Sequence, residues 1–373
     1  MSFEHTRAAA RAQTRRLLLA ALVGAGARAA CKGADAGTPE EPITETPPPS
    51  TRWVAGYWVG YQRDLYPETE VDFSLLTHVM VGAINPTPSG GVTRDLFIDN
   101  TTGPQVARTL ATRAHQAGRK AILMLGGAGQ HDNLASAASP ANRATFVANL
   151  LTTMDDLGYD GIDVDWEPIE TADRPALLAL VQALRAARPG MILTVPVYFT
   201  NANFPGDVDG WYAQLAAPLD QLNIMSYDMA DNWGGWVSWH TSALQAEGAD
   251  HPTSVASSVR AYRDAGVPAA KIGIGIPFYG ACWRGPTAPL QPLGSTAGVV
   301  AGDNVMSYPN LLATYFDAAA YHWDDAAKMP YLGFTSPRGP QRCTFISYDD
   351  PQSIAAKGAY VKTQGLGGAI VWT

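Results

Sequence analysis

Eight short apolar segments alternate with segments of helical periodicity along most of the chain, and this alternation limits the possible folds more than any other feature. The apolar segments cover residues 53–60, 76–84, 120–125, 159–168, 191–197, 219–227, 271–278 and 368–373, and the helical patterns cover residues 106–116, 142–157, 176–187, 212–215, 253–265 and 353–363. Strands that are apolar along their whole length are typical of a parallel sheet that is buried on both faces. Eight such strands, most of them followed by a helical segment, predict an α/β fold, the (β/α)8 TIM barrel, with the site at the carboxyl ends of the strands.

The fourth apolar segment carries acids at alternate positions, Asp163, Asp165 and Glu167, which would share one face of a strand. Their Cα atoms would lie about 6.7 Å apart at each step. At an effective dielectric constant of about 20, two charges at that distance repel by roughly 2–3 kcal/mol, which corresponds to near 2 pKa units. We therefore expect one of the three carboxyl groups to keep a proton near neutral pH, as a general acid must.

Two simpler interpretations of these acids stay open at this point, a cluster of exposed acids on an edge strand and a strand that binds a divalent metal. None of the seven histidines has the spacing of zinc ligands, and the sequence has no glycine-rich phosphate loop, so we expect no metal and no cofactor. The formal net charge is −8, and no basic run follows the N-terminal region, so the composition argues against a nucleic-acid partner.

The N-terminal part of the sequence differs in composition from the rest. Basic residues precede an apolar run at residues 17–27, which is typical of a signal peptide and too short to span a membrane. Residues 1–31 are therefore predicted to direct secretion, and Cys31 also fits the end of a lipoprotein signal, which would add a lipid anchor. Residues 32–50, rich in Pro, Thr and Glu, predict an extended linker before the catalytic domain at residues 51–373.

About 90 residues separate the seventh and eighth predicted strands, which is far more than one connecting helix needs. Within them, residues 282–348 hold many Tyr, Phe and Trp side chains between Gly and Pro, and they predict a small α+β insertion. In an exported protein Cys282 and Cys343 would form a disulfide. The alternative is two free buried thiols.

Two short segments resemble motifs of the chitinases of glycoside hydrolase family 18. Residues 160–167, DGIDVDWE, resemble the signature DGxDxDxE, and residues 225–228, MSYD, resemble the motif MxYD, two predicted strands downstream. The resemblance covers nearly all of the predicted folded chain. It implies a TIM barrel in which an insertion between the seventh and eighth strands deepens the substrate cleft.

The resemblance also implies a mechanism that is assisted by the substrate, whose own 2-acetamido oxygen attacks C1. Glu167 would then donate a proton to the leaving oxygen and later activate water. Asp165 would orient the acetamido group, Asp163 would hold or share a proton with Asp165, and Tyr227 would bind the acetamido carbonyl. Asp160 would support the turn that precedes the strand.

Further residues are candidates for substrate binding by the same resemblance: Tyr57, Met225, Asp228, Trp233 and Trp372. Trp372 matches the tryptophan at the bottom of the family's cleavage subsite, where a flat indole suits the apolar face of a sugar ring. For Met225 and the aromatic residues, the alternative is an ordinary place in the core or at the rim of the barrel.

Two features depart from the family pattern. Residues 124–127 read MLGG where SxGG is usual, so Gly126 and Gly127 are kept as structural support. Met124, however, stands in place of the serine that supports the hydrogen bonds of the acidic strand. The sequence ends at Thr373 with the eighth predicted strand, whereas a closing helix is usual in this barrel.

These features predict a secreted, monomeric chitinase that hydrolyses β-1,4 linkages between N-acetylglucosamine units of chitin or chitooligosaccharides. The alternatives are an endo-β-N-acetylglucosaminidase that acts on N-glycans, a non-catalytic chitin-binding lectin on the same barrel, and a metal-dependent hydrolase. Lectins of this kind typically lack the acid at the position of Glu167, so its presence argues against a lectin.

Overall fold

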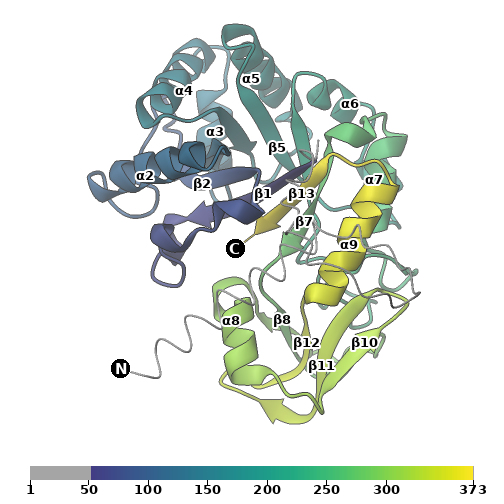
Figure 1. Ribbon diagram of the computed structural model, residues 1–373. Helices are drawn as coiled ribbons and strands as arrows, with labels where there is room; N and C mark the ends of the chain where they lie inside the picture. Colours follow the sequence, from purple (N-terminus) through teal and green to yellow (C-terminus); the bar gives the residue numbers. More distant parts are fainter. Residues whose placement is uncertain (1–51, 373) are drawn as a thin grey trace, which may run out of the picture.

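Eight parallel strands close into a barrel in the computed structural model, which describes residues 52–372 (Figure 1). The strands follow the order of the chain around the barrel, and the last strand closes the ring between β7 and β1. They are β1 Trp53–Val59, β2 His78–Ile84, β3 Lys120–Gly126, β4 Gly161–Asp165, β5 Ile192–Tyr198, β6 Gln221–Met225, β7 Ile272–Pro277 and β13 Gly368–Trp372. The predicted TIM barrel is confirmed.

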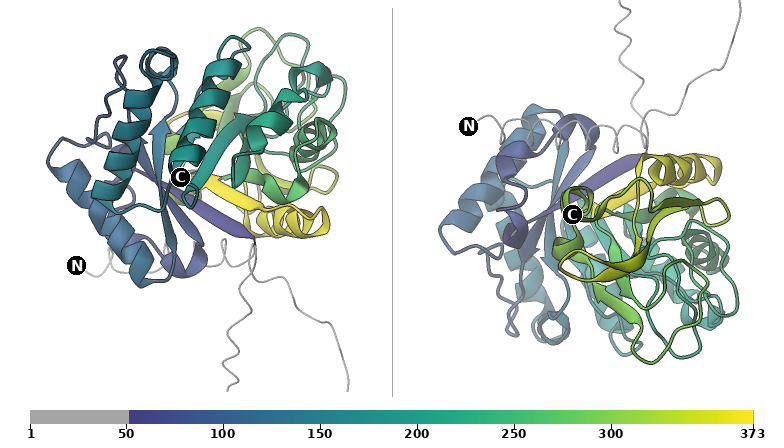
Figure 2. Two further views of the ribbon diagram at one scale, coloured as in Figure 1. Left: turned by 90° about the horizontal axis from the view of Figure 1, so that it is seen from above. Right: turned by 90° about the horizontal axis from the view of Figure 1, so that it is seen from below.

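Helices surround the strands, as the two views of Figure 2 show. They are α2 Thr102–Gln116, α3 His131–Ala137, α4 Arg143–Leu157, α5 Arg174–Ala187, α6 Trp211–Ala216, α7 Val255–Asp264 and α9 Pro351–Thr363. Helix α2 begins before the predicted residue 106, because the Asp99 carboxylate accepts hydrogen bonds from the backbone amides of Thr101 and Thr102. The sequence did not predict α3, which has seven residues and is too short to show a helical period.

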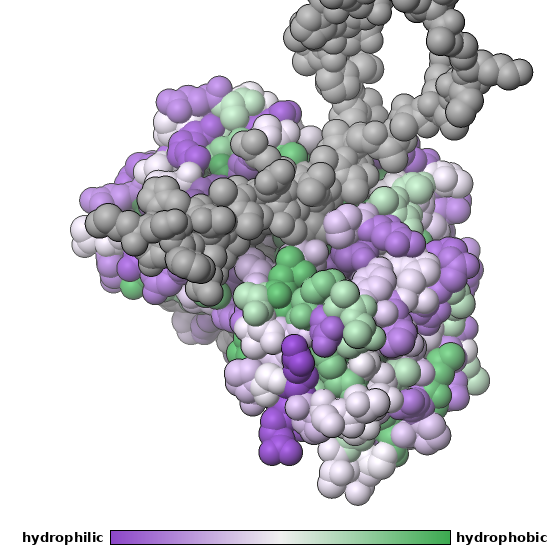
Figure 3. Space-filling view, turned by 60° about the horizontal axis from the view of Figure 1, so that its bottom comes forward, coloured by the Kyte–Doolittle hydropathy of each residue, from purple (hydrophilic) through white to green (hydrophobic). Residues whose placement is uncertain are grey.

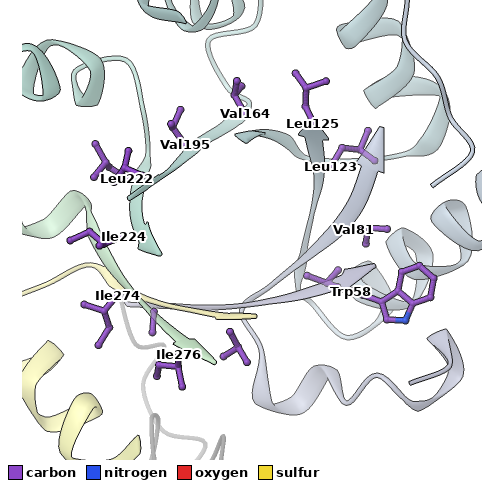
Figure 4. Close-up of a cluster of buried hydrophobic side chains, with 14 of the residues drawn as sticks. Trp58, Val81, Leu123, Leu125, Val164, Val195, Leu222, Ile224, Ile274 and Ile276 are labelled. Carbon is purple, nitrogen blue, oxygen red and sulfur yellow. The ribbon is translucent and has the colours of Figure 1, made fainter. Parts of the chain in front are cut away.

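Alternate residues of each strand point outward and inward, and this alternation separates the core from the site. Figure 4 shows outward side chains such as Leu123, Val164 and Ile274, which belong to the large apolar cluster between the strands and the helices. Inward residues of β1, β2, β3 and β13 form a smaller cluster inside the barrel. On β4, Val164 points outward, so its neighbours Asp163 and Asp165 lie on the inner side.

A five-stranded antiparallel sheet lies between β7 and β13 in the sequence and beside the barrel in space (Figure 1). Its strands are β8 Ala281–Arg284, β9 Gly298–Ala301, β10 Tyr321–Asp324, β11 Met329–Arg338 and β12 Cys343–Ser347, and the short helix α8 Tyr308–Asn310 accompanies them. The sheet packs on a core of its own around Trp239, Trp283 and Phe345. On the face drawn in Figure 3, polar and apolar residues are mixed over the described part of the surface.

A disulfide joins Cys282 on β8 to Cys343 on β12, two neighbouring strands of this sheet whose linked Cα atoms lie 5.3 Å apart. The bond closes a loop of the chain, because the two cysteines are 61 positions apart. Most of the loop's ordered structure, from β9 to β11, therefore lies between the two linked residues.

Buried polar contacts fix the sheet to the loop that follows β6. The imidazole of His240, in that loop, lies 3.2 Å from the Ser347 hydroxyl on β12 and 3.1 Å from the Asp324 carboxylate on β10. Nearby, Lys357 on α9 forms an ion pair with Asp349, 2.6 Å long, in which both side chains are fully buried.

The predicted signal peptide, the linker and the lipid anchor at Cys31 all lie outside the described residues, as does Thr373. Within residues 52–372, no helix combines the length and the apolar character that crossing a membrane would need.

We expect replacement of both cysteines, Cys282→Ala with Cys343→Ala, to lower the free energy of unfolding by about 4 kcal/mol, because the open loop regains conformational entropy in the unfolded chain. Urea unfolding followed by fluorescence measures the change. Treatment of the wild-type protein with a reductant should shift the unfolding midpoint in the same direction. Equal stability of the double variant and the oxidised wild type would contradict the prediction.

Candidate active site

Strand β4 places two acids inside the barrel and then ends. Asp163 is fully buried and Asp165 is 4% exposed. Glu167 lies two positions beyond the end of the strand, so the prediction that all three acids share one face of a strand is wrong for Glu167. A hydrogen bond between Asp165 and Glu167 nevertheless brings the third carboxyl group back to the other two.

Each carboxylate oxygen of Asp163 accepts a hydrogen bond from a hydroxyl group. Tyr57 on β1 donates to Oδ2 over 2.7 Å, and Thr194 on β5 donates to Oδ1. Burial raises the pKa of Asp163 to about 6, although both hydroxyl groups oppose that rise by stabilising the ionised form. Asp163 therefore titrates near neutral pH rather than near the usual value for an aspartate.

Asp165 and Glu167 form a pair that retains a proton. Burial raises the pKa of Asp165 well above its usual range, and the nearby charges of Glu167 and Asp163 raise it further. Burial also raises the pKa of Glu167, against hydrogen bonds from the Tyr198 hydroxyl, Asp165 and the Ala128 amide. Because two adjacent carboxylates in a buried site repel each other, the pair favours the state that shares one proton.

Tyr227 and Asp228 follow β6 on the same side of the barrel. Tyr227 is half-buried, and the charges of Asp165 and Glu167 add to burial in raising the pKa of its phenol. Asp228 accepts a hydrogen bond of 2.8 Å from the hydroxyl of Tyr279, which follows β7. The structure thus places Tyr227 close enough to the acid pair to interact with it electrostatically.

Trp372, at the end of β13, packs beside the acids through Tyr57. The two ring centroids lie 5.2 Å apart in an edge-on arrangement. The Trp372 side chain is also hydrogen-bonded to Asp303, in the segment after β9. Its indole is partly exposed, so part of the ring remains available for contact with a ligand.

Met225 and Trp233 differ in their surroundings. Met225, the last residue of β6, is 9% exposed and lies on the wall of the barrel. Trp233, in the loop after β6, is 41% exposed and contacts other aromatic rings, Phe199 in a stacked arrangement at 6.4 Å and Trp236 edge-on at 4.8 Å. These three rings form a separate aromatic surface above the strands.

Three predicted support residues act on the ends of β4. Asp160, just before the strand, binds Lys120 and His115 through its side chain and so lies away from the acid pair. Gly126 and Gly127 have φ of +92° and +96°, which favour glycine. A Cβ on Gly126 would come within 2.7 Å of the Asp165 carbonyl oxygen, which accepts a 2.8 Å hydrogen bond from the Gly127 amide.

Sequence reasoning missed three side chains that the structure adds to the site. Thr194 binds Asp163, Tyr198 donates to Glu167 Oε2 over 3.1 Å, and Asp303 binds Trp372. Thr194 is a polar residue inside an apolar strand, and Tyr198 ends that strand, so both carried a weak signal. Asp303 lies in the insertion, where no pattern indicated its position.

One group of potential metal ligands lies near the end of β4, among the described residues. Ligand atoms of His131, Glu170 and Asp173 all lie within 4.8 Å of one another. His131 already contacts Asp173 at 2.9 Å, and the Glu170 amide donates to the same Asp173 oxygen. Asp173 therefore binds both of its neighbours in the group, and the three residues are not the acids of the site.

The arrangement suits proton transfer to a bound molecule. Glu167 is partly exposed, and burial raises its pKa, which favours the protonated form that can donate to a leaving group. Asp165 and Asp163 can then stabilise a positive charge that develops nearby. The partly exposed indole of Trp372 offers a flat apolar surface beside them.

The sequence is similar to those of curated chitinases. The chain is 34% identical over 260 residues to a probable endochitinase of Caenorhabditis elegans and 32% identical over 269 residues to chitinase A1 of Niallia circulans. These matches cover 64% and 63% of this chain but only 40% and 37% of the relatives, so the chain spans about two fifths of their length.

The fold is also similar to that of solved structures. The crystal structure of a group IV chitinase of Ostrinia furnacalis in complex with allosamidin superposes with a TM-score of 0.71 at 20% identity, over 86% of this chain and 92% of that one. The model of glycosyl hydrolases family 18 matches residues 54–373. The barrel, the position of the acids and this match together show that the chain belongs to family 18 of the glycosyl hydrolases.

Proposed function

We propose that this protein is a chitinase that hydrolyses β-1,4 linkages between N-acetylglucosamine units by a substrate-assisted mechanism with retention. The observation that carries the proposal is the contact between the buried Asp165 and the partly exposed Glu167, inside a barrel of this family, where burial raises the pKa of both carboxyl groups. The chitinase names of the relatives support chitin or a chitooligosaccharide as the substrate.

In the first step, the proton of Glu167 passes to the oxygen of the glycosidic bond as that bond to C1 breaks. The 2-acetamido oxygen of the same sugar attacks C1 and forms a cyclic oxazolinium ion. Asp165 lies beside Glu167 and accepts a hydrogen bond from the acetamido N–H, which holds the oxygen in line and stabilises the positive charge.

In the second step, Glu167 removes a proton from a water molecule that attacks C1. The ring of the oxazolinium ion opens, and the product keeps the configuration of the substrate. The two attacks on C1 come from opposite sides, which is the reason for retention. Tyr227 donates from its phenol to the acetamido carbonyl, a role that its high pKa allows because the group stays protonated.

Binding of the polymer is assigned to the aromatic residues. Trp372 receives the apolar face of the sugar at the cleavage position, with Tyr57 behind it. The exposed surface of Trp233, stacked on Phe199, provides a second platform for a neighbouring sugar. Asp228 and Met225 complete the wall after β6.

The sequence pattern of residues 1–31 supports export of the protein from the cell. We expect the protein to begin after residue 29 and to be recovered from the culture medium if a signal peptidase acts at Ala27-Arg28-Ala29. If the lipoprotein signal is used, the protein should begin at a lipid-modified Cys31 and be recovered with the membranes. N-terminal sequencing and mass spectrometry of the expressed full chain distinguish the two. Recovery of the uncleaved chain in the cytoplasm alone would contradict export.

Replacement of the acid, Glu167→Gln, is expected to lower kcat on a chitooligosaccharide by at least about 100-fold, since the amide cannot donate the proton of a carboxylic acid. Proton NMR of the wild-type reaction should show the β-anomer as the first product. Activity should survive EDTA, which a metal-dependent hydrolase would not. A high-mannose glycoprotein should release no glycan, whereas an endo-β-N-acetylglucosaminidase would release it. Undiminished hydrolysis by the Gln variant would refute the assignment of Glu167.

Removal of one hydroxyl, Tyr198→Phe, is expected to raise the pKa of Glu167, because the hydrogen bond to Oε2 stabilises the ionised carboxylate. The proton is then retained to higher pH, so the alkaline limb of kcat should move up by about 0.5–1 pH unit. The matched control is Tyr360→Phe on α9, outside the barrel. This variant should leave the alkaline limb of kcat at the wild-type pH. A limb that moves to lower pH, or not at all, would contradict the role of Tyr198.

A further inference from the structure

The buried carboxylate of Asp163 has a neighbour on each side in the barrel wall. In the strand register, Asp163 is paired with Met124 on β3 and with Thr194 on β5. Met124 is 4% exposed and belongs to the apolar cluster inside the barrel, so it offers no donor. Thr194 is fully buried, and its hydroxyl donates to Asp163 Oδ1. Of the two flanking strands, only β5 supplies a hydrogen bond to this carboxylate.

None of the other groups that face Asp163 in the described structure carries a positive charge, so the ionised carboxylate depends on hydroxyl donors such as Thr194. The charge of Glu167 favours the neutral form of Asp163, and the charge of Asp163 in turn raises the pKa of Asp165. Tyr57 and Tyr227 are phenols that remain uncharged. The ionised form is therefore stabilised by hydroxyl groups, one on each oxygen. Loss of one donor leaves a buried carboxylate oxygen without a partner, and the pKa of the group rises.

We propose that Thr194 is a positioning residue of the reaction, which keeps Asp163 ionised and fixed in orientation beneath Asp165. This inference rests on the proposed function. An ionised Asp163 raises the pKa of Asp165 and thereby keeps a proton on the pair that Asp165 forms with Glu167. Thr194 touches no substrate, because its side chain is fully buried behind Asp163. It acts on the chemistry only through that carboxylate.

The test compares Thr194→Val, which has the same shape and no hydroxyl, with Thr194→Ser, which keeps the hydroxyl. In Thr194→Val we expect kcat on a chitooligosaccharide to fall about 10-fold while KM changes less than about twofold. The pKa of Asp163 rises, so it becomes protonated at a higher pH as the solution is acidified. The acid limb of kcat/KM should therefore move up by about one pH unit. Thr194→Ser should keep at least half of the wild-type kcat, and the acid limb of its kcat/KM profile should stay at the wild-type pH.

The outcomes separate this inference from the function on which it rests. If the wild-type protein cleaves no chitooligosaccharide, the proposed function fails. If the wild type is active and Thr194→Val keeps both its kcat and its acid limb, the role of Thr194 is overturned. Equal losses in the Val and Ser variants would show a packing role and also overturn it. Thr194→Ala carries the same expectations and serves as the second variant if the Val variant does not fold, as judged by circular dichroism.

Discussion

Negative charge inside the barrel is the constraint on which the site depends. Three carboxyl groups lie within one short stretch of chain, and two of them are almost completely removed from solvent. Within the described residues, the hydrogen bonds that Asp163 accepts from side chains come from hydroxyl groups on two other strands. Hydroxyl groups stabilise an ionised carboxylate less than a cation would, so the site keeps protons that an exposed cluster of acids would lose.

The barrel could be predicted because its signal is distributed over the whole chain. Apolar strands of the right length recur at regular intervals, and each helix shows its own period, so errors of a few residues do not change the topology. Similarly, the alternation of Ile162, Asp163, Val164 and Asp165 was enough to predict that the two aspartates share one face. Their inward direction then follows from the outward cluster to which Val164 belongs.

The rest of the site could not be predicted, for specific physical reasons. Side chains alternate between two faces only within a strand, and β4 ends at Asp165. The sequence pattern therefore misplaced Glu167, whose position depends on the loop after the strand. Thr194 and Tyr198 stand out only weakly in their own strand, and their partners Asp163 and Glu167 become known only when β5 is placed beside β4. The order of the strands in the insertion, β10-β11-β12-β8-β9, depends on pairing between distant segments, which local patterns do not encode.

The contacts of the loop after β6 determine how far that side of the site can move. That loop begins with Tyr227 and contains His240 and Ser242, and it is joined to the insertion and to α9 by buried groups, including the 2.7 Å hydrogen bond from Lys357 to Ser242. Separating these parts would take the Ser242 hydroxyl away from the buried Lys357 ammonium and the buried His240 imidazole away from Ser347 and Asp324. The position of the loop that carries Tyr227 and Asp228 is therefore set, relative to the insertion and α9, when the protein folds.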